Sequence, residues 1–201
     1  MFTGLIRTQG TIRRVDQRGD CMVTIAVAEP FAMEIGASIC CNGICLTVVK
    51  INDNEFKVSL SGETMLRTTA REWQVGTVIN LEPSLAVGDA MGGHFVSGHV
   101  DGLARAVAAQ KDGDSTVWKF EVPPHLARFI AAKGSVTLDG VSLTVNEVED
   151  VALPSPTTRF TVNIIPHTAK VTGFGRLKVG DAVNLEIDML ARYVARLAER
   201  K

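Results

Sequence analysis

The sequence has little of what marks several large protein classes. Its 201 residues include one tyrosine and two tryptophans, and aromatic residues make up only 5%. The net charge is −1, and no run of lysine or arginine is long enough to indicate nucleic acid binding. The apolar stretches are short and broken by charge or glycine, so we expect no membrane-spanning helix. The N-terminus has no basic segment followed by an apolar one, which predicts a cytoplasmic location without a secretory signal.

Signatures of common catalytic and metal sites are missing as well. The sequence contains no phosphate-binding P-loop, no GxGxxG and no CxxC spacing. It has four cysteines, of which Cys21, Cys40 and Cys41 are best interpreted as buried, reduced thiols. We therefore predict no metal site.

What the sequence does contain is an internal repeat. "FTGLI" (residues 2–6) matches "VSGHV" (residues 96–100), with glycine in the same place. Three further pairs of blocks follow in the same order: "GASICCNGICLTVVKI" with "KGSVTLDGVSLTVNEV", "FKVSLSGET" with "FTVNIIPHT", and "VGTVINLE" with "VGDAVNLE". Four collinear matches predict two copies of one fold.

Each copy has the pattern of an all-β domain. Short segments rich in Val, Ile and Thr alternate with Gly, Asn or Asp turns, which predicts two tandem similar six-stranded β-barrels. We place the barrels at residues 1–94 and 95–187. Residues 30–34 and 123–131, which begin at prolines, are each predicted to form one short helix. Residues 188–201 predict a C-terminal α-helix with one apolar stripe, which packs either on its own barrels or at a subunit interface.

Few residues suggest chemistry by themselves. The turns "CNG" and "LDG" are predicted hairpin turns, and they precede Cys45 and Ser142 at equivalent positions. A small core residue is the simpler interpretation of Cys45, since a nucleophile needs a neighbouring base. His94 is interpreted as a satisfied loop or surface residue. His99 follows the repeated glycine, and a functional role is as plausible for it as a structural one.

The longer motifs are specific when taken together. "MFTGLI", "GASICCNGICLTV", "MGGHFVSGHVDG", "KGSVTLDGVSLTV" and "NLEIDMLARYV" resemble the riboflavin synthase family, of the single-chain, duplicated-barrel type, over effectively the whole chain. The resemblance implies an enzyme that converts two molecules of 6,7-dimethyl-8-ribityllumazine into riboflavin and 5-amino-6-(D-ribitylamino)uracil. It also implies a homotrimer without cofactor or metal, and it leaves open an association with lumazine synthase.

The resemblance further implies site residues, grouped by barrel. Positions linked to catalysis are Cys45, Ser38, His99, Asp188 and Phe2. Substrate-binding positions of the N-terminal barrel are Gly4, Leu5, Ile6, Leu46, Thr47, Ser59, Leu60, Ser61, Gly62, Glu63 and Thr64. Those of the C-terminal barrel are Gly98, Val100, Lys133, Ser142, Leu143, Thr144, Asn163, Ile164, Ile165, Pro166, His167 and Thr168, with His99 beside them.

Two other functions share this kind of barrel. Antenna proteins of luminous bacteria hold a lumazine or flavin without turning it over, but they lose ligand positions of the C-terminal barrel that this chain keeps. A flavin-binding reductase barrel would need a separate nicotinamide-binding domain, for which no chain is left.

Overall fold

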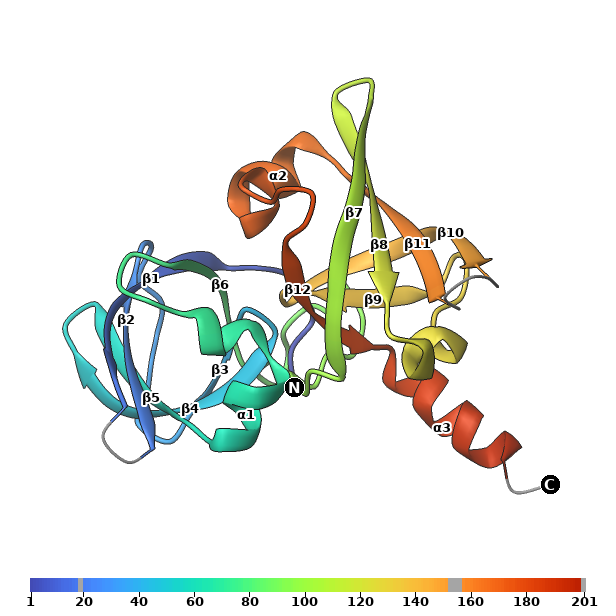
Figure 1. The fold of residues 1–201 in the computed structure, drawn as a ribbon. Coiled ribbons are helices and arrows are strands. Elements are labelled where there is room, and N and C mark those ends of the chain that lie inside the picture. Colours follow the sequence, from blue (N-terminus) through green and yellow to red (C-terminus); the bar gives the residue numbers. More distant parts are fainter. Residues whose placement is uncertain (18–19, 152–156, 200–201) are drawn as a thin grey trace.

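The chain forms two closed barrels, which lie beside each other, and a helix that extends from the second (Figure 1). The computed structural model describes residues 1–17, 20–151 and 157–199; positions 200–201 of the predicted helical segment therefore lie outside the described residues. Each barrel has six antiparallel strands. The predicted fold class is confirmed.

Both barrels join their strands in the same circular order, which is β1-β2-β5-β4-β3-β6 in the N-terminal barrel. Its strands are β1 (Thr8–Asp16), β2 (Cys21–Val27), β3 (Ser38–Cys41), β4 (Ile44–Asn52), β5 (Glu55–Leu60) and β6 (Val78–Pro83). Those of the C-terminal barrel are β7 (Gly102–Asp112), β8 (Ser115–Val122), β9 (Ser135–Leu138), β10 (Val141–Val151), β11 (Thr157–Ile164) and β12 (Ala182–Ile187). The repeat in the sequence is thus a repeat of topology.

Alternation along the strands builds a separate core in each barrel. In β5, Phe56, Val58 and Leu60 are buried, while the residues between them face outward. Because successive side chains of a strand point to opposite faces, this pattern fills the barrel and leaves an outer face for ligands. The apolar residues of the other strands form one cluster per barrel.

The predicted turns are present at the β3–β4 and β9–β10 hairpins. Asn42 and Asp139 adopt φ of 52° and 47°, and each precedes a glycine with positive φ. This is the geometry of a two-residue type I′ turn, which asparagine, aspartate and glycine tolerate. The two turns place Cys45 and Ser142 at matching positions of β4 and β10.

The short helices are only partly as predicted. A 3₁₀ helix, η2, covers Pro124–Phe129, but the helix predicted at residues 30–34 is wrong, since these residues form no helix. Two helices were not predicted: α1 (Gly62–Arg67) and α2 (Pro166–Val171), each followed by a 3₁₀ turn, η1 (Thr69–Glu72) or η3 (Gly173–Gly175). Ser61 caps α1 by accepting from the Thr64 amide (3.1 Å), and a proline begins α2.

The predicted C-terminal helix, α3, covers Met189–Ala198 and points away from the barrel in Figure 1. Its apolar stripe does not pack on the barrels: Leu190, Tyr193, Val194 and Leu197 are each 66–70% exposed. Ion pairs connect the helix region to the barrel: Arg192 pairs with Asp101 (2.7 Å), and Arg128 pairs with Glu199. No helix among the described residues is long and apolar enough to cross a membrane.

The two barrels meet through equivalent contacts. The backbones of Phe2 and Val96 exchange two hydrogen bonds (2.8 and 3.1 Å), so the repeated opening segments pair with each other. The Asn80 side-chain amide donates to the Asp139 carbonyl (2.9 Å), and the Asn184 amide donates to the Asn42 carbonyl (2.8 Å). An approximate twofold relation between the barrels follows from these matched pairs.

Candidate functional site

The opening segment of each copy crosses to the strand of the other barrel. The Cys45 amide of β4 donates to the Gly98 carbonyl (2.8 Å), and the Ser142 amide of β10 donates to the Gly4 carbonyl (2.8 Å). A strand of each barrel therefore lies against the short segment that begins the other copy of the repeat. We call residues 4–6 the first lip and residues 98–100 the second lip.

A buried carboxylate anchors each lip. Glu82 accepts from the Thr3 amide and hydroxyl (both 2.7 Å) and from the Gly4 amide (3.0 Å). Glu186 accepts in the same way from the Ser97 amide (2.7 Å), the Ser97 hydroxyl (2.6 Å) and the Gly98 amide (2.9 Å). Burial raises the pKa of both carboxyl groups, and these hydrogen bonds oppose the rise.

The N-terminal barrel carries a groove of about 360 Å³ beneath the second lip. Its lining residues are Ile44, Cys45, Glu63, Thr64, Arg67, Thr68, Gly98, His99, Val100 and Asp101. The structure therefore brings Cys45 and His99 into one site. The prediction that grouped residues 98–100 with the C-terminal barrel is wrong, because the chain crosses between barrels there; Val100 packs on the N-terminal core.

The C-terminal barrel has a matching polar cluster around Ser142, beneath the first lip. His94 Nδ1 lies 2.7 Å from the Ser142 hydroxyl, and His94 Nε2 lies 3.1 Å from the Thr137 hydroxyl. Burial lowers the pKa of His94, while the negative charge of Asp188 raises it. Ile6 of the first lip packs on this barrel's core, so residues 4–6 belong to this site and not to the N-terminal one.

Sequence reasoning missed His94 as a site residue. The aligned blocks begin at residue 2, so His94 has no counterpart in the first copy and the repeat could not point to it. Its glycine-rich surroundings were the available signal. The structure places it between the hydroxyls of Ser142 and Thr137, where a neutral imidazole can accept or donate a proton.

The other residues linked to catalysis lie near these two clusters in different ways. Phe2 is fully buried at the junction of the barrels, packed with Cys40 and Val96. Ser38 on β3 pairs with Thr47 on β4, two residues beyond Cys45. Asp188 caps α3, since its Oδ1 accepts from the Leu190 amide (2.9 Å). The charge of Asp188 also acts on His94, whose pKa it raises.

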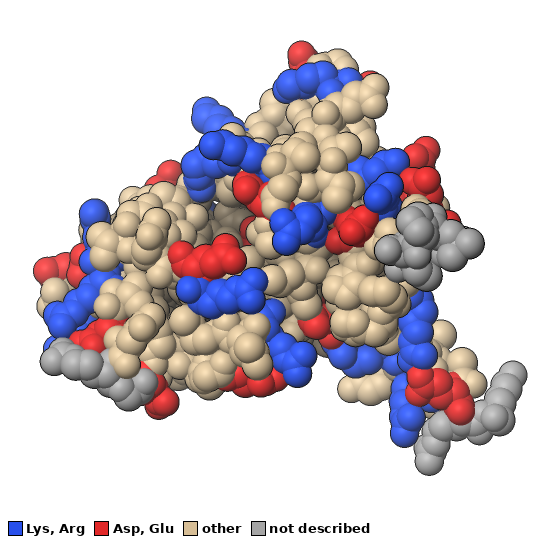
Figure 2. Space-filling view, viewed as in Figure 1, with Lys and Arg blue, Asp and Glu red and all other residues tan. Residues whose placement is uncertain are grey.

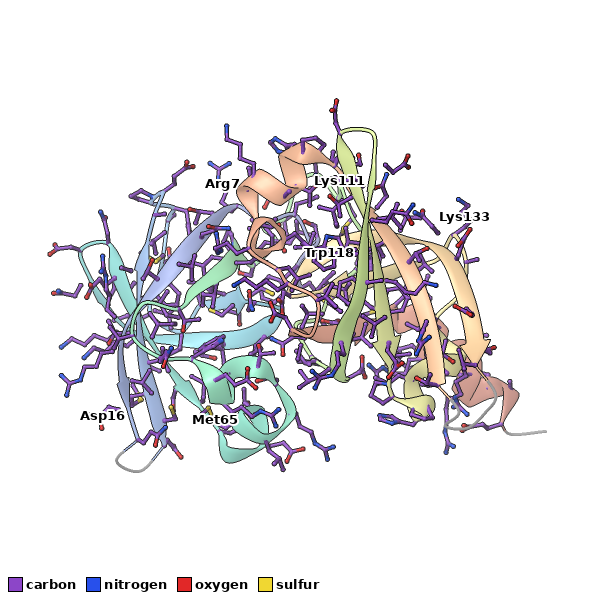
Figure 3. All side chains as sticks on the ribbon, turned by 45° about the horizontal axis from the view of Figure 1, so that its top comes forward. Arg7, Asp16, Met65, Lys111, Trp118 and Lys133 are labelled. Atoms are coloured by element: carbon purple, nitrogen blue, oxygen red, sulfur yellow. The ribbon has the colours of Figure 1, made fainter. Side chains whose placement is uncertain are left out.

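The remaining predicted positions line the ends of equivalent strands and helices. In β4 and β10 these are Leu46, Thr47, Leu143 and Thr144; at the ends of β5 and β11 they are Ser59, Leu60, Asn163 and Ile164; in the α1 and α2 regions they are Ser61, Gly62, Glu63, Thr64, Ile165, Pro166, His167 and Thr168. The side chains of Leu46, Leu60 and Ile164 lie in the cores, so these three residues can offer only backbone groups to a ligand. Lys133 lies on the side of its barrel away from the N-terminal barrel (Figure 3).

All four cysteines are free thiols, and Cys21, Cys40 and Cys41 are buried as predicted. Cys45 is half-buried at the groove, where a ligand can reach it. No cluster of three metal-binding side chains occurs among the residues that the structure describes.

Comparison with known proteins matches both barrels. The lumazine binding domain family matches residues 3–84 and again residues 97–188. A riboflavin synthase from Brucella abortus is 47% identical over 206 residues, covering 99% of this chain and 98% of the relative. A riboflavin synthase from Photobacterium phosphoreum is 40% identical over 200 residues, covering 98% of this chain and 88% of the relative.

Solved structures share the fold. The crystal structure of LumP complexed with riboflavin superimposes with a TM-score of 0.79 and 24% identity, covering 93% of this chain and 99% of that one. LumP has also been crystallised with 6,7-dimethyl-8-(1'-D-ribityl) lumazine, with a TM-score of 0.76. From the full-length relatives and the doubled domain match, we conclude that the chain belongs to the riboflavin synthase family of enzymes, with two lumazine-binding domains in tandem.

Proposed function

We propose that this chain converts two molecules of 6,7-dimethyl-8-ribityllumazine into riboflavin and 5-amino-6-(D-ribitylamino)uracil, the final step of riboflavin biosynthesis. One lumazine gives a four-carbon unit to the other, so no oxidant or further reactant is needed. The observation that carries the proposal is the pair of matched sites, with Cys45 beneath one lip and Ser142 beneath the other. LumP, which shares the fold, holds this lumazine and riboflavin in its crystals.

Two copies of one site suit a reaction between two identical molecules. Holding both reactants in fixed positions replaces a bimolecular encounter and contributes about 7–11 kcal/mol in favourable cases. We propose that residues 1–94 and 95–187 each hold one lumazine, with the lips exchanged between them. The two rings then meet across neighbouring subunits.

The protein must move a proton and stabilise negative charge. The 7-methyl group of the lumazine is acidic because its anion delocalises into the ring system. In the N-terminal site His99 is the proposed proton carrier, and Cys45 with Ser38 contacts the ring. In the C-terminal site His94 and Ser142, 2.7 Å apart, form the matching proton relay. The negative charge of Asp188 favours the protonated form of His94, against the effect of burial, and Asp188 orients a hydroxyl or water.

A turnover assay tests this function. Incubation of the purified chain with the lumazine should produce flavin absorption, and two lumazines should disappear for each riboflavin formed. A protein that binds the lumazine without forming flavin would be an antenna-type binding module instead. Activity that needs an added cofactor would also contradict the proposal.

The role of Asp188 can be separated from its cap of α3. Asp188→Asn keeps an oxygen acceptor for the Leu190 amide but loses the charge beside His94, so we expect turnover to fall at least about tenfold, with a changed pH profile. Asp188→Ala also loses the cap, which costs about 1 kcal/mol of stability. Wild-type turnover in the asparagine variant, with loss only in the alanine variant, would show a purely structural role.

We further propose that the chain assembles as a homotrimer through α3, residues 188–201 forming the contact segment. Four apolar side chains on one face of α3 are about two-thirds exposed, and such a continuous stripe on a soluble chain indicates a protein interface. Association with lumazine synthase and a cytoplasmic location stay predictions.

The assembly can be tested on that stripe. Val194→Glu places a charge in the centre of the exposed face, so sedimentation should show monomers where the wild type shows trimers. Turnover should fall with the trimer if the two rings meet across subunits. Arg196→Glu, an exposed charge outside the stripe, is the control and should leave the trimer intact. A monomeric wild type would contradict the proposal.

A further inference from the structure

A basic groove lies on the outer face of the N-terminal barrel, on β1, β2, β4 and β5. Its volume is about 410 Å³, and its charged lining consists of Arg13, Arg14, Lys50, Lys57 and a single carboxylate, Glu55. None of these residues belongs to the proposed lumazine sites. Figure 2 shows acidic and basic side chains intermixed over the face in view, in contrast to the lining of this groove.

The strand register arranges these cations in a row. Lys50 of β4 lies directly opposite Lys57 of β5. Lys57 lies opposite Thr24 of β2, and Thr24 lies opposite Arg14 of β1. Directly opposed like charges destabilise an antiparallel sheet, because their side chains lie on the same face about 5 Å apart at Cβ. Stability of the barrel therefore does not explain the Lys50–Lys57 pair.

Among the four cations of the groove, only Arg14, at the edge of the row, forms an ion pair with a carboxylate of the described residues. Arg14 pairs with Asp16 (3.3 Å), which is labelled on the N-terminal barrel in Figure 3. Arg13, Lys50 and Lys57 have no ion pair within the described residues. Three cations are thus available to an anion in the groove.

The second barrel provides an internal comparison. The strand bulge before Arg14 recurs before Ala108, and the matching row there contains Ala108, Lys119 and Thr161, while Glu147 stands in the aligned block where the first copy has Lys50. Its only cation, Lys119, pairs with Glu149 (3.2 Å). On this surface, the positive charge is therefore neutralised in the C-terminal barrel and in excess in the N-terminal barrel. The excess charge belongs to the first copy and not to the fold.

We propose that this groove binds the phosphate group of a small ligand. A phosphate carries up to two negative charges and several acceptor oxygens, which suits a row of lysines flanked by an arginine. Ser59, a proposed substrate contact, lies two residues from Lys57 on the same face of β5, roughly 7 Å away. The phosphate comes either from solution or from the ribityl end of a ligand in the lumazine site; only the second source rests on the proposed function.

Titration with inorganic phosphate tests the first source. Wild-type chain should show saturable binding by calorimetry and a rise in its unfolding midpoint with phosphate. Lys50→Gln with Lys57→Gln should weaken binding at least about tenfold, as expected for losing charged hydrogen-bond donors. Without phosphate, the double variant should unfold no earlier than wild type, since a repulsion has been removed. Lys119→Gln is the matched control in the other barrel and should bind phosphate like wild type.

Comparison of flavin mononucleotide with riboflavin tests the second source. Tighter binding of the mononucleotide, lost in the double variant, would assign the groove to a phosphate on the ribityl chain. Failure of riboflavin itself to bind would count against the proposed function and not against the groove. The groove proposal is overturned if wild type neither binds inorganic phosphate nor prefers the mononucleotide to riboflavin. It is also overturned if the double variant keeps the phosphate binding or the mononucleotide preference that wild type shows.

Discussion

Gly98→Ala is expected to remove the N-terminal lumazine site and to lower turnover at least about a hundredfold. A Cβ atom at Gly98 would lie 2.6 Å from Cys45 Cβ and 2.8 Å from the Cys45 amide nitrogen, and the backbone there has φ of +79°. The second lip must therefore move off β4, breaking the hydrogen bond that holds it over Cys45. Because two lumazines are needed, loss of one site disables the reaction.

Ligand stoichiometry measures this directly. Fluorescence titration with riboflavin should give two sites per chain in wild type and one in Gly98→Ala. Gly4→Ala should lose the other site, since a Cβ there would lie 2.5 Å from Ser142 Cβ.

Gly36→Ala is the control for backbone strain alone. Gly36 has φ of +89°, but a Cβ there has nothing within 4 Å. It should cost about 1–2 kcal/mol of stability and keep both sites. Two intact sites and normal turnover in Gly98→Ala would contradict the proposed role of the lip.

Asp139→Asn is expected to remove a large pH dependence of stability. Burial raises the pKa of Asp139 from 3.8 to about 7, with hydrogen bonds from the Asn184 amide and the Asn42 side chain opposing the rise. The folded chain therefore holds this proton more tightly than the unfolded chain. The resulting stability is fully present below pH 4 and is lost as the pH rises to about 7; the difference corresponds to about 4 kcal/mol.

Urea unfolding at fixed protein concentration, from pH 4 to pH 8, measures the effect. Burial also raises the pKa of Glu82 and Glu186, so wild type loses stability with pH at these groups too. Their contribution cancels in the difference between wild type and variant. That difference should change by about 4 kcal/mol over the interval. A difference that is constant with pH would contradict the assignment to Asp139.

The pair of turns also supplies a matched control. The Asn42 oxygen accepts from the Asn80 amide (3.0 Å), and an Asp139 oxygen accepts from the Asn184 amide (2.8 Å). With asparagine at both positions, both side-chain oxygens are occupied, so the two side-chain NH2 groups face each other and neither can accept a hydrogen bond. Asn42→Asp combined with Asp139→Asn returns one acceptor to the pair, so it should restore the pH dependence.

Prediction from the sequence worked where local pattern decides structure. The strands follow the alternation of apolar residues, as in Glu55–Leu60, and the type I′ turns follow "CNG" and "LDG". It failed where local signals were weak. Residues 30–34 form no helix despite the proline, while α1 formed in a segment for which no helix was predicted, because the Ser61 cap and the Glu63–Arg67 pair were overlooked.

The amino-acid sequence alone determined that the chain holds two copies of one barrel, because duplicated blocks keep the spacing of their core and turn residues. Only the tertiary structure decided which barrel each lip serves. That choice depends on Glu82 and Glu186, which bind the first glycine of each lip, 78 and 88 positions away along the chain. It also brought His94 to Ser142, a pairing that no local spacing encodes, since contacts between distant segments depend on how the two barrels pack.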